Sequence, residues 1–356
     1  MIPEHWLRAA LSPPAAWGEP LGGATLRATP EDFEVEEILG FSPGGEGPHA
    51  LLTVRKRGAN TEWVARELAR LVGCKPFEVG YAGLKDRNAV TTQHFTVPRG
   101  KRAAAEFIGL AGEGYEVRAA AEHQRKLPRG ALEGNRFSIT ARGLSCDPAR
   151  LAERIARIAA GGVPNYFGSQ RFGRDAGNLA DVLRAAQKLA QGAGDARVRR
   201  RGRDDQGFML SAARSLVFNA ILAERIARGT WNELQAGDVA NLDGRGSVFV
   251  VSEVDAELRA RCAALDLHPT APLPGRGESL AGGDVLALEN SVGASFPEAL
   301  AVIGAEGMNS ERRALRMRVR DLSYEYTGDV LLLRFALGAG SFATTVLREI
   351  IALTGE

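Results

Sequence analysis

The order in which strand and helix patterns follow one another constrains this chain most. Apolar and polar residues alternate over 23–40 and 48–56 and in the runs YEVRAA and NRFSITAR, as strands with one buried face require. From Asp147 to about residue 305 helical spacing dominates, and alternation returns in ALRMRVRDL and DVLLLRFAL. This order predicts that both ends of the chain pair into one sheet domain and that the middle forms an insertion.

The helix signals are local. Thr61 is expected to cap a helix whose Val64 and Leu68 face one side, and Asp147 with Pro148 begins another helix that stops at Gly161. A short strand is expected in SVFVVS. Further helices are expected at 178–190, 208–228, 254–265, 296–305 and 341–353.

Length and composition narrow the class of protein. A chain of 356 residues exceeds the size at which one core usually stops growing, so two domains are expected. No run of about 18 apolar residues is present, and the start MIPEHWLRAALSPPAAW lacks the basic region and apolar stretch of a secretion signal. We therefore expect a cytoplasmic protein that spans no membrane.

The cysteines and histidines are scattered. Cys74, Cys146 and Cys262 lack the paired spacing of a zinc site or a redox pair, and the five histidines do not cluster either. We expect neither a structural disulfide nor a protein-bound metal.

Positive charge is concentrated in one segment, although the net charge is only +2. DARVRRRGRDDQ holds Arg199, Arg200 and Arg201. Such a run is either a solvated surface or a contact with nucleic-acid phosphates, where each guanidinium displaces condensed counterions.

The run GYAGLKDRNAVTTQHFTVP (residues 80–98) places glycines and charged residues directly before an alternating strand. Alone it is typical of a surface turn, because Gly, Asp and Asn relieve tight backbone geometry. Four other stretches share its crowding of small, polar and aromatic residues: TPEDFEVEE, GALEGNRFSI, PNYFGSQRFG and GAGSFATTVLREI.

Together these five stretches resemble the tRNA pseudouridine synthase D (TruD) family, from about Thr25 to Ile351. The resemblance implies an α+β fold: a pseudouridine synthase-type catalytic domain with a mixed, mostly antiparallel sheet, and an inserted α/β domain. We place the catalytic domain at 1–162 and 312–356 and the insertion at 163–311, with RNA in the cleft between them.

The resemblance also implies roles for individual residues. Asp86 matches the catalytic aspartate of the family, and Arg27 falls where the family has a basic residue able to pair with it. Four residues match positions that line the uridine pocket: Phe33, Asn135, Phe137 and Phe342.

The chemistry of the residue types agrees with these roles. Pseudouridine formation breaks the bond from ribose C1′ to N1 and rejoins the base through C5, so it needs no cofactor. A carboxylate can act as the nucleophile or base. Whether it attacks C6 of the base or assists deprotonation at C2′ through a glycal-like intermediate is left open. Aromatic rings can stack on an extruded base, and Asn135 can hydrogen-bond a pyrimidine edge.

Other residues are candidates for contact with the RNA backbone. They are Lys85, beside the aspartate, and Arg171 and Arg174 in the stretch PNYFGSQRFGRDAGN. The alternative for this stretch is a packed interdomain loop. We expect HPTAPLPGRG (268–277) to be a rigid connection and Asp238 to lie in a turn.

By resemblance the substrate is tRNA, the target is the uridine at position 13 of the D arm, and the protein acts as a monomer without an obligate protein partner. One alternative is an RNA-binding or chaperone protein that kept the fold without the activity. Another is a methyltransferase, which requires a Gly-rich loop between a strand and a helix; PGGEG and AGEG do not lie in such a unit.

Overall fold

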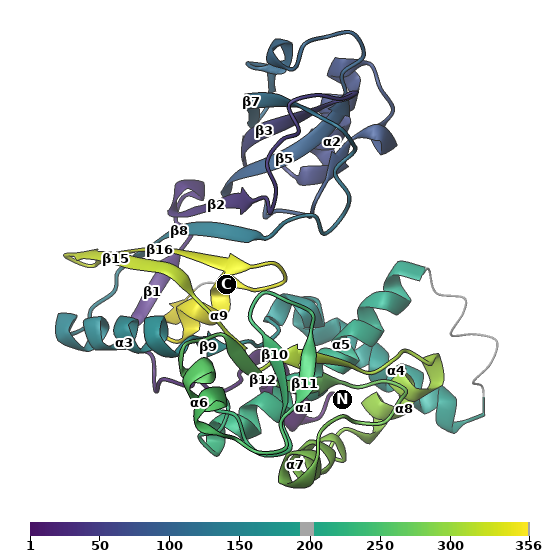
Figure 1. Cartoon of the computed structure of the whole chain (residues 1–356), viewed down its shortest axis with the longest axis vertical. Coiled ribbons are helices and arrows are strands. Elements are labelled where there is room, and N and C mark those ends of the chain that lie inside the picture. The colour runs from purple at the N-terminus through teal and green to yellow at the C-terminus, as the bar shows by residue number, and fades with distance from the viewer. Residues whose placement is uncertain (193–202, 355–356) are drawn as a thin grey trace. The chain divides into compact units, whose positions relative to one another are not determined.

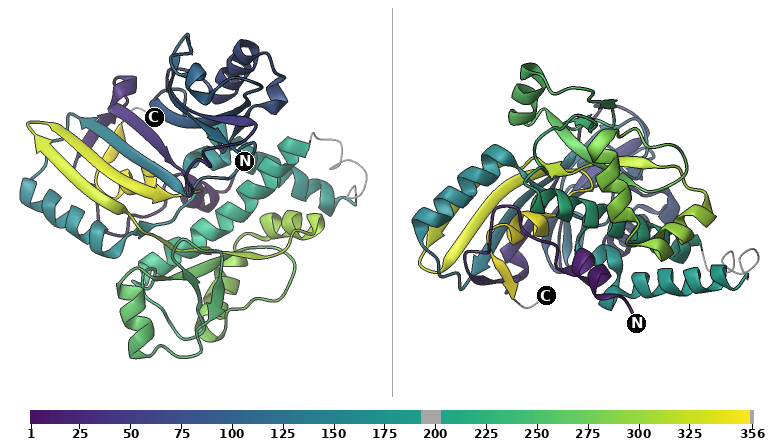
Figure 2. Two further views of the ribbon diagram at one scale, coloured as in Figure 1. Left: turned by 45° about the horizontal axis from the view of Figure 1, so that its top comes forward. Right: turned by 90° about the horizontal axis from the view of Figure 1, so that it is seen from below.

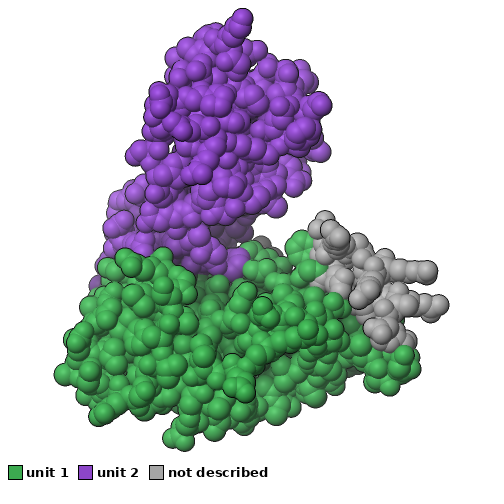
Figure 3. Space-filling view, turned by 45° about the vertical axis from the view of Figure 1, so that its right-hand side comes forward, with its two compact units in different colours: residues 1–20, 153–318, 344–350 green, residues 21–152, 319–343, 351–356 purple. Residues whose placement is uncertain are grey.

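The computed structural model describes residues 1–192 and 203–354. It divides into two compact units, coloured separately in Figure 3. Unit 1 contains Met1–Pro20, Glu153–Arg318 and Thr344–Ile350, and unit 2 contains Leu21–Ala152, Val319–Ala343 and Ile351–Glu356. The middle segment of unit 1 contains the whole of the predicted insertion, but unit 1 also takes residues from both ends of the chain. The insertion boundaries at 163 and 311 stay a prediction.

Unit 2 is built on one mixed sheet (Figure 1), with the order β15-β16-β8-β2-β5-β3-β7-β6. The pairs β1–β17 and β2–β5 are parallel, and the other pairs are antiparallel. The strands are β1 (Gly23–Leu26), β2 (Phe33–Ile38), β3 (His49–Arg57), β4 (Gly80–Tyr81), β5 (Val90–Pro98), β6 (Ala111–Gly112), β7 (Tyr115–His123), β8 (Gly134–Arg142), β15 (Arg320–Thr327), β16 (Val330–Gly338) and β17 (Ala352–Thr354). The predicted α+β class, with both chain ends in one mostly antiparallel sheet, is confirmed.

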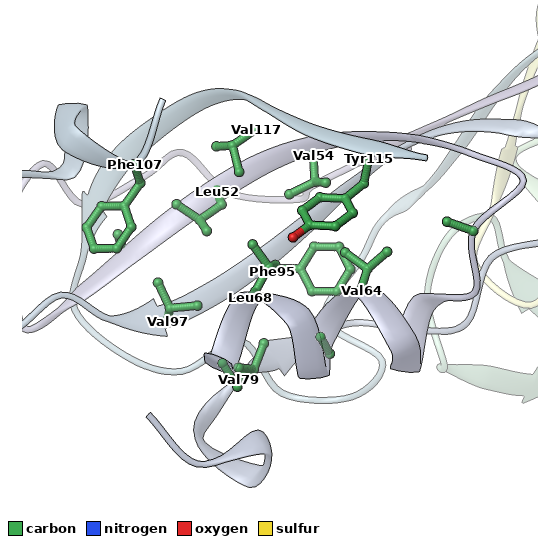
Figure 4. Packing of buried hydrophobic residues seen from close by; sticks show 14 of the residues in the cluster. Leu52, Val54, Val64, Leu68, Val79, Phe95, Val97, Phe107, Tyr115 and Val117 are labelled. Atoms are coloured by element: carbon green, nitrogen blue, oxygen red, sulfur yellow. The ribbon is translucent and has the colours of Figure 1, made fainter. Parts of the chain in front are cut away.

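Helix α2 (Thr61–Val72) packs on this sheet. The Asn60 side chain, one residue earlier than the predicted cap, accepts hydrogen bonds from two backbone N–H groups of the first turn, and Gly73 ends the helix in the left-handed conformation. Figure 4 shows Val64 and Leu68 of α2 facing Phe95 of the sheet. These side chains are fully buried in the core cluster that joins α2 to the strands beneath it.

Unit 1 combines helices with two small sheets (Figures 1 and 2). The sheets have the orders β11-β10-β12-β13 and β14-β9, and both are antiparallel. Their strands are β9 (Val163–Pro164), β10 (Val239–Leu242), β11 (Val248–Val250), β12 (Leu267–Leu273), β13 (Glu311–Ala314) and β14 (Arg316–Met317). The helices are α1 (Glu4–Leu11), α4 (Gly177–Ala190), α5 (Arg203–Ala227), α6 (Ala256–Ala263), α7 (Gly283–Gly293) and α8 (Pro297–Glu306).

Helices α3 (Pro148–Gly161) and α9 (Ala343–Arg348) contain residues of both units. Among the helices of the described residues, none is long and apolar enough to cross a membrane.

Several local predictions were wrong. The helix expected at 341–353 is only α9, and the residues after it form β17, because Ala352 and Leu353 pair in parallel with β1. The run ALRMRVRDL is divided between β14 and β15. The start of the segment expected to be a rigid connection is β12, whose prolines lie between β10 and β13.

Asp238 ends a turn, as predicted, because its backbone N–H donates to the carbonyl of Gln235 at 3.0 Å. It is fully buried and pairs with Arg225 at 2.8 Å, so it is a core ion-pair residue as well as a turn residue. Its carboxylate also accepts the backbone N–H of Gln235.

Candidate active site

The register of unit 2 gathers the predicted pocket residues on one face of the sheet. Val35 lies opposite Phe137, and Glu37 lies opposite Asn135. Residues directly opposite in an antiparallel pair point to the same side, and so do every second residue along a strand. Phe33 therefore shares this face with Asn135 and Phe137.

Asp86 lies over this face, in the loop between β4 and β5. Its Oδ1 accepts the backbone N–H of Asn88 at 2.9 Å, which fixes the carboxylate in a local turn. Its Oδ2 lies 2.9 Å from Nη2 of Arg27. The side chain of Asp86 remains 39% exposed, so the carboxylate is oriented but accessible.

Arg27 is held in an unusual conformation. It follows β1 with φ of +57°, a left-handed backbone that costs a residue with a side chain about 1 kcal/mol or more. Its guanidinium lies 4.3 Å from the ring centre of Phe33. The arginine is thus packed on an aromatic face and directed at Asp86, which matches the pairing that the resemblance implies.

The aromatic residues form a packed layer. Phe33 and Phe137 meet edge to face at 6.3 Å, and Phe137 stacks on Phe335 of β16 at 5.3 Å. Phe33 and Phe137 are only 5% and 6% exposed. They therefore form the floor beneath the site, and any contact with a base is restricted to the small exposed part of each ring.

Asn135 has an open hydrogen-bonding capacity. Its side-chain Oδ1 is buried and has no hydrogen-bond partner within the described residues. A buried amide oxygen without a partner costs about 1–3 kcal/mol, and a ligand N–H or O–H could satisfy it. Phe342 is half-buried beyond the end of β16, and its place at the pocket stays a prediction.

Lys85 does not have the surface position that contact with an RNA phosphate requires. Its side chain is 8% exposed, and its Nζ lies 2.8 Å from Oε1 of Glu37, whose side chain is fully buried. Burial alone would raise the pKa of Glu37, but the hydrogen bonds from His94 and the charge of Lys85 outweigh it and lower that pKa. Lys85 is therefore better explained as the partner of a buried carboxylate.

Lys56 is a second buried cation behind the loop. Its Nζ donates to the carbonyls of Ala59 and Asp86, both at 3.0 Å. Burial lowers the pKa of Lys56 to about 8, against the opposing charge of Asp86. The side chain of Lys56 thus contacts the backbone carbonyl of Asp86, the catalytic candidate.

The candidates in unit 1 differ from one another. Arg171 donates to Oγ of Ser211 at 3.0 Å and lies 5.1 Å from the ring centre of Phe167, and burial lowers its pKa. Arg174 is exposed, as a phosphate contact requires. Tyr166 is buried. Arg199, Arg200 and Arg201 lie outside the described residues.

Sequence reasoning missed Glu37 and Lys56, although the strand alternation contains a signal for both. In FEVEEI, Phe33, Val35 and Glu37 occupy the inward positions. In HALLTVRKR, Lys56 lies on the face that carries Val54. A charged residue that continues an apolar face must find a buried partner, which is the property that marks both residues.

This arrangement can perform one kind of chemistry well. An accessible carboxylate is oriented beside an arginine that packs on an aromatic ring, and the same face of the sheet carries an amide whose oxygen lacks a partner within the described residues. The fold and the site together are suited to an α+β enzyme in which a carboxylate acts as a nucleophile or a base.

Comparison with known proteins gives the family. The chain belongs to the tRNA pseudouridine synthase D (TruD) family, whose model matches residues 16–184 and 204–350. A tRNA pseudouridine synthase D of Methylococcus capsulatus is 45% identical over 341 residues, which cover 95% of this chain and 94% of that protein. One from Stutzerimonas stutzeri is 42% identical over 347 residues, which cover 96% and 97%.

A solved structure agrees on the fold. A Methanosarcina mazei crystal structure that carries the same tRNA pseudouridine synthase D description has a TM-score of 0.77 to this chain. It is 23% identical and covers 98% of both chains.

Proposed function

We propose that this protein isomerises uridine to pseudouridine in the D arm of tRNA, at position 13, with Asp86 as the catalytic group. The observation that carries the proposal is the pairing of the accessible Asp86 carboxylate with Arg27 at 2.9 Å on the aromatic floor. Membership of a family whose members are named tRNA pseudouridine synthase D supports the reaction and the substrate class.

Arg27 has a definite part in this chemistry. The guanidinium of Arg27, at 2.9 Å from the carboxylate, orients Asp86 and balances its charge when the substrate excludes water from the site. Asp86 then acts either as a nucleophile that attacks C6 of the base, or as a base that assists deprotonation at C2′. In either route Asp86 is regenerated: the C1′–N1 bond breaks, the C1′–C5 bond forms, C5 loses a proton and N1 gains one. No external oxidant or reductant is consumed.

Asn135 and the aromatic floor act on the base. A stacked uridine cannot reach Asp86, so the base must leave the RNA stack at a cost of a few kcal/mol. The unpaired Oδ1 of Asn135 can accept the N3–H of uracil, which recovers a hydrogen bond that the free protein lacks. The exposed edges of Phe33 and Phe137 limit how deeply the ring enters.

Three further properties belong to the same proposal. The protein acts in the cytoplasm, on its tRNA substrate, as a monomer, and without a metal or an organic cofactor. Light scattering of the free protein and of its tRNA complex tests the monomer, since a mass of two chains in either sample would contradict it.

The reaction is tested by release of tritium from tRNA that carries [5-³H]uridine, because the isomerisation replaces the C5–H bond. We expect release with purified protein in the presence of a chelator, after the tRNA has been folded with a monovalent salt. A strict divalent requirement under these conditions would contradict the cofactor-free reaction.

Position 13 is tested with a matched substrate. A tRNA in which only U13 is replaced by cytidine should release no tritium above background. Undiminished release from this tRNA would assign the activity to another uridine.

A further inference from the structure

The loop that carries Asp86 has two different sides. Its outer side exposes Leu84, Asp86, Arg87 and Asn88. On its inner side, polar side chains from α2, β3 and β5 hydrogen-bond to the loop backbone, and Glu37 of β2 pairs with the side chain of Lys85. Nothing in a surface turn requires such contacts, because water satisfies exposed turn groups.

Thr61 and Gln93 connect two groups of the loop. Thr61 Oγ1 accepts the backbone N–H of Lys85 at 3.0 Å and donates to Oε1 of Gln93 at 3.0 Å. Gln93 Nε2 then donates to the carbonyl of Gly83 at 2.6 Å. Each donor meets an acceptor, so the orientations of the hydroxyl and the amide are fixed by their partners.

Two lysines extend these contacts to the end of the loop. Lys56 donates to the backbone carbonyl of Asp86 at 3.0 Å, and Lys85 pairs with Glu37 at 2.8 Å. The side chains of Thr61, Gln93, Lys56 and Glu37 are buried. Gln93, Lys56 and Glu37 lie on one face of the sheet, because Gln93 is opposite Val54, two residues before Lys56, and Glu37 aligns with this face through β5. Thr61 begins helix α2.

We infer that Thr61 and Gln93, supported by Lys56 and the Lys85–Glu37 pair, are positioning residues that hold the 83–86 backbone so that Asp86 is delivered to its substrate already oriented. The inference rests on the proposed function. Hydrogen bonds to the Gly83 carbonyl, the Lys85 N–H and the Asp86 carbonyl fix backbone groups both before and after the Asp86 side chain. A nucleophile displaced by about 1 Å can lose about 100-fold in rate, so this fixation affects turnover more than binding.

The decisive variant is Thr61→Val. It keeps the side-chain shape but removes the acceptor for Lys85 and the donor for Gln93. We expect the single-turnover rate of saturated enzyme to fall at least tenfold, while the dissociation constant for tRNA changes less than twofold. Thr61→Ser, which keeps the hydroxyl, should retain a rate close to that of the wild type.

Thr96→Val is the matched control. Thr96 is buried on β5, and its Oγ1 accepts the backbone N–H of Leu127 at 2.8 Å. This variant also leaves one backbone N–H without its partner, but in a segment other than the Asp86 loop. Its melting temperature should fall about as much as that of Thr61→Val, with its turnover nearly unchanged.

Hydrogen–deuterium exchange supplies a readout independent of activity. The Lys85 amide should exchange faster in Thr61→Val and in Gln93→Met, and not in Thr96→Val. Equal turnover in the Thr61→Val and Thr96→Val variants, or unchanged exchange at Lys85, would overturn the inference. Failure of the proposed function itself would appear differently, as a wild-type protein that releases no tritium.

Discussion

The loop around Asp86 in unit 2 and the stretch from Asn165 to Ala176 in unit 1 are similar in the kinds of residue that they contain but differ in structure. Both crowd glycines, charged residues and aromatics into a short space. In the Asp86 loop, the buried polar groups come from neighbouring elements and leave the carboxylate accessible. In the unit 1 stretch, a polar side chain of the segment itself, Asn165, turns inward, while Arg174 and Asp175 stay exposed.

Asn165 and Phe167 illustrate the second arrangement. Asn165 is buried and accepts from Arg313, whose guanidinium lies 4.2 Å from the ring centre of Phe167. Asn219 satisfies both backbone groups of Phe167. An unusual run of residues therefore marks either a site or a buried polar anchor, and the direction of its polar atoms distinguishes the two.

The two regions should differ most in the effect of replacing their aspartates. Asp86→Asn keeps shape but removes charge and nucleophilicity, so single-turnover product formation should fall by at least about 1,000-fold, or about 4 kcal/mol of barrier. The tRNA dissociation constant should stay nearly unchanged. Asp175→Asn is the control, because Asp175 is exposed in a left-handed conformation that Asn tolerates. An Asp86→Asn variant within about tenfold of wild type would remove Asp86 from the catalytic role.

The buried anchor of unit 1 should show the reverse behaviour. Asn219→Leu removes the partners of the Phe167 backbone and of the Ala9 carbonyl, which costs about 2–4 kcal/mol of unfolding free energy. Urea unfolding should show this loss, while turnover per folded molecule stays close to wild type. Lost turnover with unchanged stability would show that the unit 1 stretch serves the reaction directly.

A smaller difference is expected between the arginines, in how they affect the salt dependence of tRNA affinity. If Arg199, Arg200 and Arg201 contact phosphates, replacing all three with Ala should flatten the dependence of tRNA affinity on salt by up to about three counterions. Arg171→Ala should leave this slope unchanged, since its guanidinium is held by Ser211. An unchanged slope in the triple variant would mark the cluster as solvated surface.

The smallest expected effect is on the pH dependence of the free energy of unfolding, through Lys56, which is buried behind the Asp86 loop. The pKa of Lys56 falls from 10.5 to about 8 on folding, so between these values the unfolded chain binds more protons and stability rises with pH. Between pH 8 and 9 the gain is about 1 kcal/mol from this group. The charged groups that act on Lys56 are Asp86, Lys85 and Glu37.

The measurement is urea unfolding at pH 8 and pH 9 for the wild type and for Lys56→Met. The variant lacks the titrating group, so its gain should be smaller by about 1 kcal/mol. Equal gains in both proteins would show that the buried ammonium imposes no such cost.

Much of unit 2 could be predicted because its signals are local. Alternation identified β3, β7 and β8, and the contrast between the chain ends and the middle predicted their pairing in one sheet. The approach of Arg27 to Asp86 was expected only through the resemblance. No spacing in the sequence joins residues 59 positions apart.

Other features depend on tertiary contacts. The sequence alone does not distinguish phenylalanines that form an exposed platform from phenylalanines that form a buried floor. The packing of Phe335 on Phe137 makes this layer a buried floor. Lys85 lies among charged residues of a turn, yet Glu37 draws it inward. The chain has only six lysines among its 45 basic residues, and two of them, Lys56 and Lys85, lie behind this loop.

The position of β8 between β2 and β16 has a consequence for synthesis on the ribosome. β8 carries Asn135 and Phe137, but its partner β16 is translated about 190 residues later, a delay of about 10–40 s at ordinary elongation rates. Until then one edge of β8 has no strand to pair with, and the floor lacks Phe335. A ribosome that stalls before residue 330 therefore displays the Asp86 loop without a finished pocket, and a chain released at that point is a substrate for chaperones and proteases.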